Sequence, residues 1–123
     1  MGILHRLSSR RDPRSSEARA RVLHRMGVTA PPIAVQWIAT KACDLKCPHC
    51  YTHAGKKSAG ELDGEEAKRL IIDELVRLER PTLVIAGGEP LLHPGFAAVV
   101  EHAHARRVPW ALHSHGGRIA EHE

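Results

Sequence analysis

Three short apolar segments, separated by two stretches with helical periodicity, constrain the fold of this chain more than any other feature. The segments are residues 33–40, 82–86 and 108–114, and Pro109 interrupts the last one near its start. The first is almost continuously apolar and partly β-branched, which predicts a strand of a parallel sheet that is buried on both faces. The alternation of strand and helix predicts an α/β fold with parallel pairing through right-handed crossovers.

The first helical stretch begins after Asp63. Glu66 follows three residues later, a spacing typical of a capping box in which the two side chains bind each other's backbone N–H groups. The helix is expected to end at Arg80-Pro81, because the residue before a proline avoids the helical conformation. The residues expected to face the sheet recur with helical spacing, and only Glu74 among them is not apolar: Ala67, Leu70, Ile71, Glu74, Leu75 and Leu78.

The second helical stretch lies between the second and third apolar segments. Pro94 is expected in its first turn, where the missing N–H costs nothing. Arg106 and Arg107 suit its C-terminal end, because cations are favoured there. Its apolar stripe is expected at Phe96, Val99, Val100 and Ala103.

Each apolar segment is followed directly by a loop with polar chemistry. Residues 41–51 contain all the cysteines, Gly87-Gly88-Glu89-Pro90 follows the second segment, and residues 113–117 read His-Ser-His-Gly-Gly. Ligands of parallel sheets bind at the carboxyl ends of the strands. The three loops are therefore predicted to converge at one edge of the sheet.

The cysteines Cys43, Cys47 and Cys50 are the three thiols of the chain. Three thiolates make a metal or cluster site that is one ligand short, and a substrate or cofactor can bind at the open position. Their spacing also fits one face of a helix, where free cysteines would act as small apolar residues. Pro48 argues against such a helix, because proline removes a hydrogen bond and clashes with the preceding turn.

Zinc is a further alternative, with His49 or His53 as the fourth ligand. His49 lies between Cys47 and Cys50. Binding of one metal ion by these three closely spaced residues would be sterically cramped. A cluster is therefore favoured over zinc, and zinc over purely structural cysteines.

The Cys-x3-Cys-x2-Cys motif after the first segment, together with Gly-Gly-Glu-Pro after the second, resembles the start of a radical S-adenosylmethionine (radical SAM) enzyme. The resemblance covers roughly residues 33–117. It implies a [4Fe–4S] cluster held by Cys43, Cys47 and Cys50, with the fourth iron chelated by S-adenosylmethionine. Reduction by a donor such as ferredoxin or flavodoxin would then cleave this cofactor to a 5′-deoxyadenosyl radical that abstracts a substrate hydrogen.

The same resemblance implies further cofactor-binding residues. Gly87, Gly88 and Glu89 match the motif that contacts the methionine amino group in similar proteins. Glycines also let backbone come close to a ligand, and the glutamate offers an acceptor for an ammonium group. His49 takes a place where family members often carry an aromatic side chain beside the adenine. The His-Ser-His run at residues 113–115 departs from the Asn-Gly usual there.

The barrel implied by this resemblance is larger than the chain. Radical SAM enzymes use a partial barrel of six βα units, and at about 30 residues per unit this needs roughly 180 residues. We therefore expect residues 31–123 to form a truncated core with the first three strands, and the chain to be a fragment. The third strand would leave an exposed edge, so the isolated chain is expected to have low stability and little or no turnover.

The run from Cys-Pro-His-Cys-Tyr to Glu-Pro-Leu-Leu-His-Pro-Gly-Phe resembles peptide-modifying maturases and haem- or cofactor-biosynthesis enzymes. The substrate, a small molecule or a peptide, is not specified by these motifs. A non-catalytic iron–sulfur or zinc binding module is the alternative function.

The net charge of +4 is concentrated at the N-terminus, because residues 1–30 carry seven arginines against Asp12 and Glu17. This basic arm is expected to hold a short helix that starts at Ser15 or Ser16 and stops at Gly27. A nucleic-acid partner is not favoured, since the basic residues are confined to the arm. No apolar run has the length of a membrane span or signal peptide, and the clustered, odd number of cysteines argues against disulfides. A cytoplasmic location is therefore expected.

Overall fold

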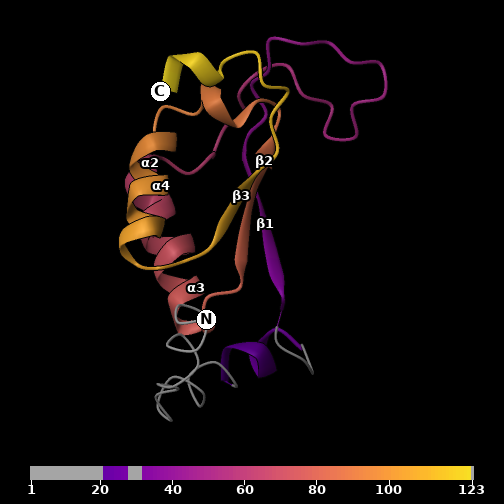
Figure 1. The fold of residues 1–123 in the computed structure, drawn as a ribbon. Helices are drawn as coiled ribbons and strands as arrows, with labels where there is room; N and C mark the ends of the chain where they lie inside the picture. The colour runs from indigo at the N-terminus through magenta and orange to yellow at the C-terminus, as the bar shows by residue number, and fades with distance from the viewer. Residues whose placement is uncertain (1–20, 28–31, 123) are drawn as a thin grey trace, which may run out of the picture.

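The fold is α/β, as predicted. The computed structural model describes residues 21–27 and 32–122, which form a three-stranded parallel sheet with helices against it (Figure 1). The strands are β1 (Ala34–Thr40), β2 (Thr82–Gly87) and β3 (Trp110–Leu112), in the order β1-β2-β3. This topology is consistent with a portion of a radical SAM-type barrel.

The register brings the ends of β1 and β2 together. Trp37 pairs with Ile85 and Thr40 pairs with Gly87, and the ladder is irregular between Ile38 and Thr40. Such bulges re-aim the backbone next to functional sites. β3 is shorter than the predicted segment 108–114, since it begins only after Pro109, and proline cannot donate to a strand ladder.

The first helical stretch begins as predicted. α2 (Gly64–Ala67) is capped by Asp63, which accepts the backbone N–H of Glu66 at 2.8 Å, while the Glu66 side chain accepts the N–H of Asp63 at 2.9 Å. The stretch continues as one turn of π-helix, η2 (Lys68–Ile72), and then as α3 (Asp73–Arg77).

The π-helical turn changes which side chains face the sheet. The N–H of Asp73 bonds to the carbonyl of Lys68, so one turn holds an additional residue. Leu70, expected on the buried face, is 46% exposed, whereas Ile72 is fully buried. The prediction for Leu70 was wrong, because the helical period on which it rested does not hold through this turn.

The second helical stretch is divided. A 3₁₀ turn, η3 (Pro90–Leu92), follows β2, and α4 (Phe96–Ala105) comes after it. Pro94 therefore precedes α4 instead of lying in its first turn, and it is Pro90 that occupies a first helical position. The predicted stripe of α4 is confirmed, since Phe96, Val99 and Ala103 are buried.

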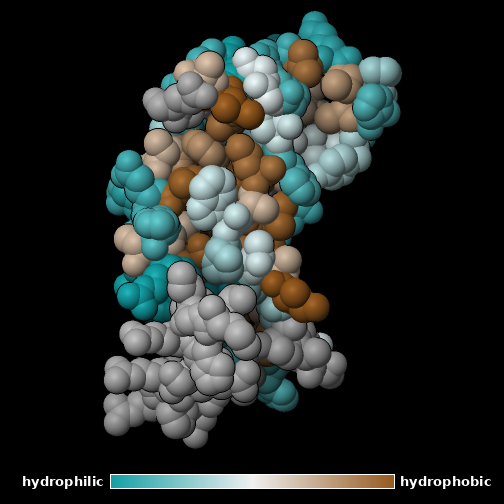
Figure 2. Space-filling view, viewed as in Figure 1, coloured by the Kyte–Doolittle hydropathy of each residue, from teal (hydrophilic) through white to brown (hydrophobic). Residues whose placement is uncertain are grey.

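The core lies between these helices and one face of the sheet. Leu83 and Ile85 of β2 are fully buried on this face, and hydrophobic residues run down the middle of the molecule while hydrophilic ones line the helical side (Figure 2). On β1, Gln36 and Ile38 are exposed. The expectation that β1 is buried on both faces was wrong, because the described helices lie on one side of the sheet (Figure 1).

Part of the N-terminal arm packs against this body. Residues 21–25 are helical and Leu23 is only 8% exposed. Gly27 follows with φ of 67°, the left-handed conformation that ends helices, as predicted for this residue. The proposed caps Ser15 and Ser16 lie outside the described residues. Within residues 21–27 and 32–122, no helix has the length and apolarity of a membrane span.

Candidate cofactor site at the carboxyl edge of the sheet

The loops that follow the three strands meet at one edge of the sheet, as expected. The N–H groups of Gly88 and Glu89 donate to the carbonyls of Thr40 and Ala42 at 2.7 and 2.8 Å. From the third loop, Ser114 and the backbone N–H of His115 donate to the Glu89 carboxylate. Backbone and side-chain hydrogen bonds thus tie all three loops together.

Gly87 and Gly88 are required by the close approach of two backbones. A Cβ atom on Gly87, which has φ of 147°, would lie 2.3 Å from the carbonyl oxygen of Thr40. A Cβ on Gly88 would lie 2.3 Å from the carbonyl oxygen of Ala42 and 2.9 Å from that of Lys41. The sequence suggested that these glycines admit a ligand, and in the structure the group they admit is the backbone leading to the cysteines.

Glu89 is fully buried, and its carboxylate already accepts several hydrogen bonds. Oε1 accepts the N–H of Leu91 at 3.1 Å and the hydroxyl of Ser114 at 2.9 Å. Oε2 accepts the same hydroxyl at 3.0 Å and the N–H of His115 at 3.1 Å. A buried carboxylate needs such donors, so Glu89 anchors the third loop to the second.

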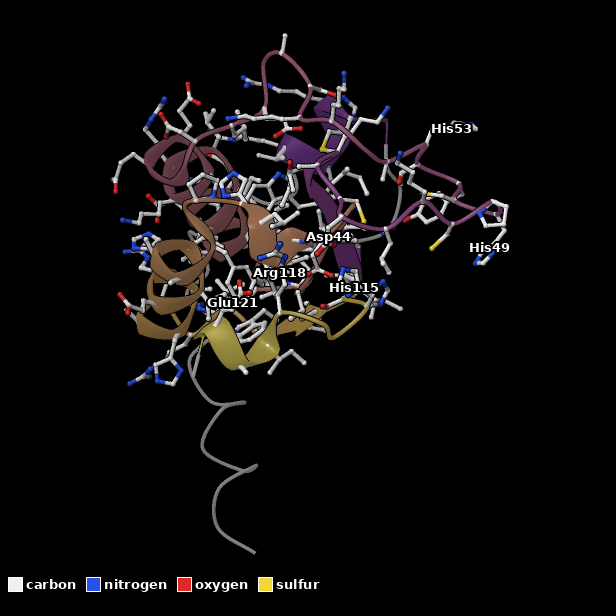
Figure 3. The ribbon with its side chains drawn as sticks, turned by 90° about the horizontal axis from the view of Figure 1, so that it is seen from above. Asp44, His49, His53, His115, Arg118 and Glu121 are labelled. Carbon is white, nitrogen blue, oxygen red and sulfur yellow. The ribbon has the colours of Figure 1, made fainter. Side chains whose placement is uncertain are left out.

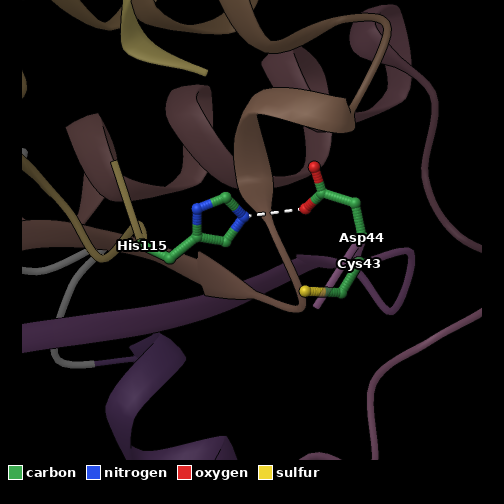
Figure 4. A group of neighbouring side chains, drawn as sticks. All are labelled: Cys43, Asp44 and His115. Carbon is green, nitrogen blue, oxygen red and sulfur yellow. Dashed lines mark hydrogen bonds and ion pairs between the residues drawn. The ribbon is translucent and has the colours of Figure 1, made fainter. Parts of the chain in front are cut away.

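His115 bridges two carboxylates and links the third loop to the first. Its Nε2 lies 2.8 Å from Oδ1 of Asp44 (Figures 3 and 4). The same nitrogen lies 3.2 Å from Oε2 of Glu89. The guanidinium of Arg118 donates to Oδ2 of Asp44 at 3.0 Å. The hydrogen bond from His115 lowers the pKa of Asp44 most. Burial opposes it, and the weaker hydrogen bond from Arg118 helps to keep the pKa below its ordinary value.

The sulfur atoms of two cysteines contact hydrogen-bond donors. The N–H of Leu45 donates to Sγ of Cys43 at 3.4 Å. Sγ of Cys50 lies 3.3 Å from the hydroxyl of Thr52 and accepts the N–H of Ala54 at 3.4 Å. The Thr52 hydroxyl and then this N–H lower the pKa of the Cys50 thiol, which favours the thiolate that ligates metals. Lys41 and Lys46, the lysines near the three cysteines, do not contribute to this lowering of the Cys50 pKa.

We call residues 41–60 the cysteine loop. Its outer part is exposed and contains no helix. The N–H of Cys50 bonds to the carbonyl of Cys47 at 3.2 Å, and Cys47 is exposed. His49 and His53 lie at the outer end of the loop, away from His115 (Figure 3). This irregular conformation agrees with the argument that Pro48 prevents a helix.

One compact group of potential metal ligands occurs among the described residues. It consists of Cys43, Asp44 and His115, whose ligand atoms all lie within 4.8 Å of one another (Figure 4). His49 and His53, expected as fourth ligands of a zinc ion, are not part of it. The three sulfurs do not form a group of this size either, so a single ion would not contact all of them in this arrangement.

Glu61 is a residue of the site that the sequence analysis missed. Its Oε1 accepts the N–H of Lys41 and the N–H of Ser58, both at 2.8 Å, and so joins the two ends of the cysteine loop. Burial raises the pKa of Glu61, but these two bonds, together with the side chain of Thr40 and the charge of Lys57, outweigh it, so the pKa lies below the ordinary value. No motif marks this glutamate, and only its position after a glycine-containing loop could have drawn attention to it.

Comparisons with known proteins point to one family. The model described as the Radical SAM superfamily matches residues 37–122. Mycofactocin maturase MftC of Mycobacterium tuberculosis is 41% identical over 88 residues, which are 72% of this chain and 22% of the relative. Pre-heme d1 synthase of Dinoroseobacter shibae is 36% identical over 89 residues, again 72% and 22%.

A third relative is similar over a shorter stretch. AdoMet-dependent heme synthase of Methanosarcina barkeri is 39% identical over 70 residues, which are 56% of this chain and 20% of the relative. The chain thus spans about a fifth of the length of these relatives. No solved structure matches it.

Proposed function

Because the chain belongs to the radical SAM superfamily, a family of enzymes, we propose that Cys43, Cys47 and Cys50 hold a [4Fe–4S] cluster beside a binding site for S-adenosylmethionine. The observation that carries this proposal is the pair of hydrogen bonds from Gly88 and Glu89 to the backbone of the cysteine loop. They join the two motifs on which cluster and cofactor binding depend.

The donor set fits such a cluster. All three cysteines are free thiols on one loop, at the edge of the sheet where ligands of parallel sheets bind. Cys43 and Cys50 receive N–H donors at sulfur, and hydrogen bonds to the sulfurs tune cluster potentials. The lowered pKa of Cys50 makes its thiolate available for ligation.

When bound, the cluster and S-adenosylmethionine would supply the one-electron chemistry that opens radical reactions in this family. The chain's own residues provide ligation and positioning. The cysteines act as thiolate ligands, Gly87 and Gly88 keep the second loop against the first, and His49, on the exposed outer part of the loop, is proposed to lie beside the adenine.

Glu89 is proposed to contact the amino group of the cofactor, which requires that one of its present hydrogen-bond donors moves away. Both carboxylate oxygens already accept hydrogen bonds from Leu91, Ser114 or His115. An ammonium group must therefore replace a donor. The Ser114 hydroxyl is the partner that turns away most easily, because a hydroxyl rotates about a single bond.

The reaction of the whole protein is proposed from its relatives. Those named above are a maturase and two enzymes of heme synthesis, which favours modification of a peptide or synthesis of a cofactor. An external one-electron donor such as ferredoxin or flavodoxin, and a reducing cytoplasmic setting, belong to the same proposal.

Anaerobic reconstitution tests the central claim. The full chain is incubated with ferrous iron and sulfide, reduced, and examined by electron paramagnetic resonance with and without S-adenosylmethionine. We expect a cluster signal that changes when the cofactor is added and that is absent in Cys43→Ala. A signal that the cofactor leaves unchanged would contradict an open iron position.

Metal binding without turnover is a second candidate function, favoured by the compact group of Cys43, Asp44 and His115. Thiolate, carboxylate and imidazole are all zinc ligands. Under this alternative the reduced apoprotein binds one zinc ion, and Asp44→Asn weakens zinc binding strongly. Under the cluster proposal, Asp44→Asn leaves the iron content after reconstitution close to that of the unsubstituted chain.

A further inference from the structure

A single carboxylate closes the base of the cysteine loop. Oε1 of Glu61 accepts the N–H groups of Lys41 and Ser58, each at 2.8 Å. Lys41 begins the loop directly after β1, and Ser58 lies near its end. Because hydrogen bonds to an ionised acceptor are about twice as strong as neutral ones, this pair is a strong constraint on how the loop leaves the sheet.

The segment between β1 and Cys43 is held on both sides. Glu61 binds the N–H of Lys41, while the carbonyl of Lys41 accepts the N–H of Gly55 at 2.8 Å. The N–H of Cys43 donates in turn to the carbonyl of Gly55 at 3.2 Å. The backbone of residues 41–43, which leads to the thiol of Cys43, is therefore held in one conformation by hydrogen bonds on both sides.

The backbone next to Glu61 is itself held by a hydrogen bond to a buried side chain. The next residue, Leu62, has its carbonyl 2.8 Å from Nε2 of His93, which is only 4% exposed. Nδ1 of His93 accepts the N–H of Gly95 at 3.0 Å, so Nε2 carries the proton and donates to Leu62. The carboxylate is thus anchored from the helical layer.

The second oxygen of this carboxylate argues for a role beyond stability. Oε2 of Glu61 is buried, and no donor of the described residues lies within 3.5 Å of it in hydrogen-bond geometry, so the side chain of Thr40, which also lowers the pKa of this carboxyl, is a weak partner at best. A buried unpaired acceptor costs free energy, and an apolar side chain would avoid that cost. The two N–H groups that Oε1 accepts offset this penalty.

We propose that Glu61 is a positioning residue for the cluster, which fixes the start of the cysteine loop so that Cys43 is presented for ligation. This proposal rests on the proposed function for the cluster itself. Glu61 acts through the N–H groups of Lys41 and Ser58 and touches neither iron nor cofactor.

The test compares three substitutions at one position in the full chain. Glu61→Ala removes both accepted bonds, Glu61→Asp shortens the side chain so that both cannot form, and Glu61→Gln keeps an oxygen acceptor of the same length. After anaerobic reconstitution with ferrous iron and sulfide, iron release to a chelator is timed for the folded fraction. We expect release at least several-fold faster in the alanine and aspartate variants, and an intermediate rate in Glu61→Gln, which keeps both bonds but loses the charge that strengthens them.

Glu65→Ala is the matched control, because it removes an exposed glutamate from the neighbouring helix, where it pairs with Lys68. Its iron release should equal that of the unsubstituted chain. If Glu61→Ala does not fold, Glu61→Asp decides. Iron release from folded Glu61→Asp and Glu61→Ala at the unsubstituted rate would overturn the proposal.

Hydrogen exchange of the apoprotein separates this proposal from the proposed function. Amides of residues 41–44 should exchange faster in Glu61→Asp and Glu61→Ala than in Glu65→Ala. If the unsubstituted chain takes up no cluster, the proposed function fails, and unchanged exchange at residues 41–44 would then overturn the positioning role as well. Faster exchange without any cluster would overturn the proposed function but support Glu61 as the residue that fixes residues 41–44, so the two failures are distinguishable.

Discussion

Gly88 sits where even a methyl group has no room, and its substitution tests the contact between the two motifs. In Gly88→Ala the new Cβ would lie 2.3 Å from the carbonyl oxygen of Ala42, so the backbone of one loop must move. Forced displacements in packed regions typically cost about 1–3 kcal/mol. We expect a lower free energy of unfolding, measured by urea denaturation, together with a lower iron content after reconstitution.

Gly55→Ala provides the control for this substitution. Gly55 also lies in the cysteine loop, but a Cβ there meets nothing within 4 Å. It should therefore leave the free energy of unfolding within about 0.5 kcal/mol of the unsubstituted value. Equal losses in the two variants would show that glycine flexibility, not the contact with Ala42, matters at position 88.

Glu61 makes the stability of the fold depend on pH in a defined direction. Its pKa is lower in the folded chain than the ordinary value of 4.5, so the folded state favours the carboxylate. The stabilisation is fully present above that ordinary value and is lost as the pH falls through the lower folded pKa. The stability advantage of the unsubstituted chain over Glu61→Gln should therefore shrink below about pH 4.5.

Urea denaturation of both proteins from pH 7 to about pH 3 measures this difference. Glu65→Gln controls for the loss of one negative charge at an exposed site. An advantage over Glu61→Gln that stays constant across the whole range would mean that ionisation of Glu61 is not linked to folding.

What the sequence revealed about single residues depended on how local the signal was. The cysteines and the glycine pair stand out because their spacing is unusual within a few positions of the chain. Glu61 does not, because its importance comes from a partner distant in sequence, Lys41. His115 belongs to a run that the sequence marks, but its pairing with the distant Asp44 could not be predicted. Glu89 was identified by its motif, yet its burial and its present donors follow from the arrangement of three loops.

At the scale of elements, order and direction could be predicted well, because hydrophobic periodicity and capping are local. The capping box at Asp63 and the parallel pairing of the strands are examples. The π-helical turn at Lys68–Ile72 was not predictable from a fixed period. The exposure of Ile38 was not predictable either, because it depends on which layers cover each face of the sheet.

Two alanine substitutions in the first helical stretch test the π-helical turn directly. Ile72 is fully buried and Leu70 is 46% exposed, although a regular helix would have placed Leu70 inward. Ile72→Ala should lower the free energy of unfolding by about 2–5 kcal/mol, as is usual for a large buried side chain. Leu70→Ala should cost less than about 1 kcal/mol. Thermal or urea denaturation with the reverse order would mean that the helix is regular in solution.

At the scale of the whole molecule, the described structure is a helical layer on one face of a short sheet, with one polar network in each layer. In the helical layer, Asp73 pairs with His102 at 3.0 Å and with Arg106 at 3.5 Å. At the carboxyl edge of the sheet, Asp44 pairs with His115 at 2.8 Å and with Arg118 at 3.0 Å. Both networks pair an aspartate with a histidine and an arginine. The second also includes Glu89 and Glu121 and links loops from different strands.

This difference in connectivity predicts different consequences of the same substitution. Asp44→Asn removes the charge that holds the third loop against the cysteine loop, where Arg118 also pairs with Glu121 at 2.9 Å. In this variant, opening of residues 113–121 no longer has to break charge-assisted hydrogen bonds to Asp44, so it costs less free energy. Amides of these residues should therefore exchange faster with solvent. Residues 64–77 should be unaffected. Hydrogen exchange followed by mass spectrometry measures both segments in one experiment.

Asp73→Asn is the matched control, since it removes an aspartate that likewise pairs with one histidine and one arginine, within the helical layer. Its faster exchange should be confined to residues 68–77 and 99–107, with residues 113–121 unchanged. Because surface pairs are screened by salt, added salt should reduce the difference between Asp44→Asn and the unsubstituted chain. Exchange at residues 113–121 that rises equally in both variants would mean that the two layers open together, and that the loops at the carboxyl edge have no separate network holding them in place.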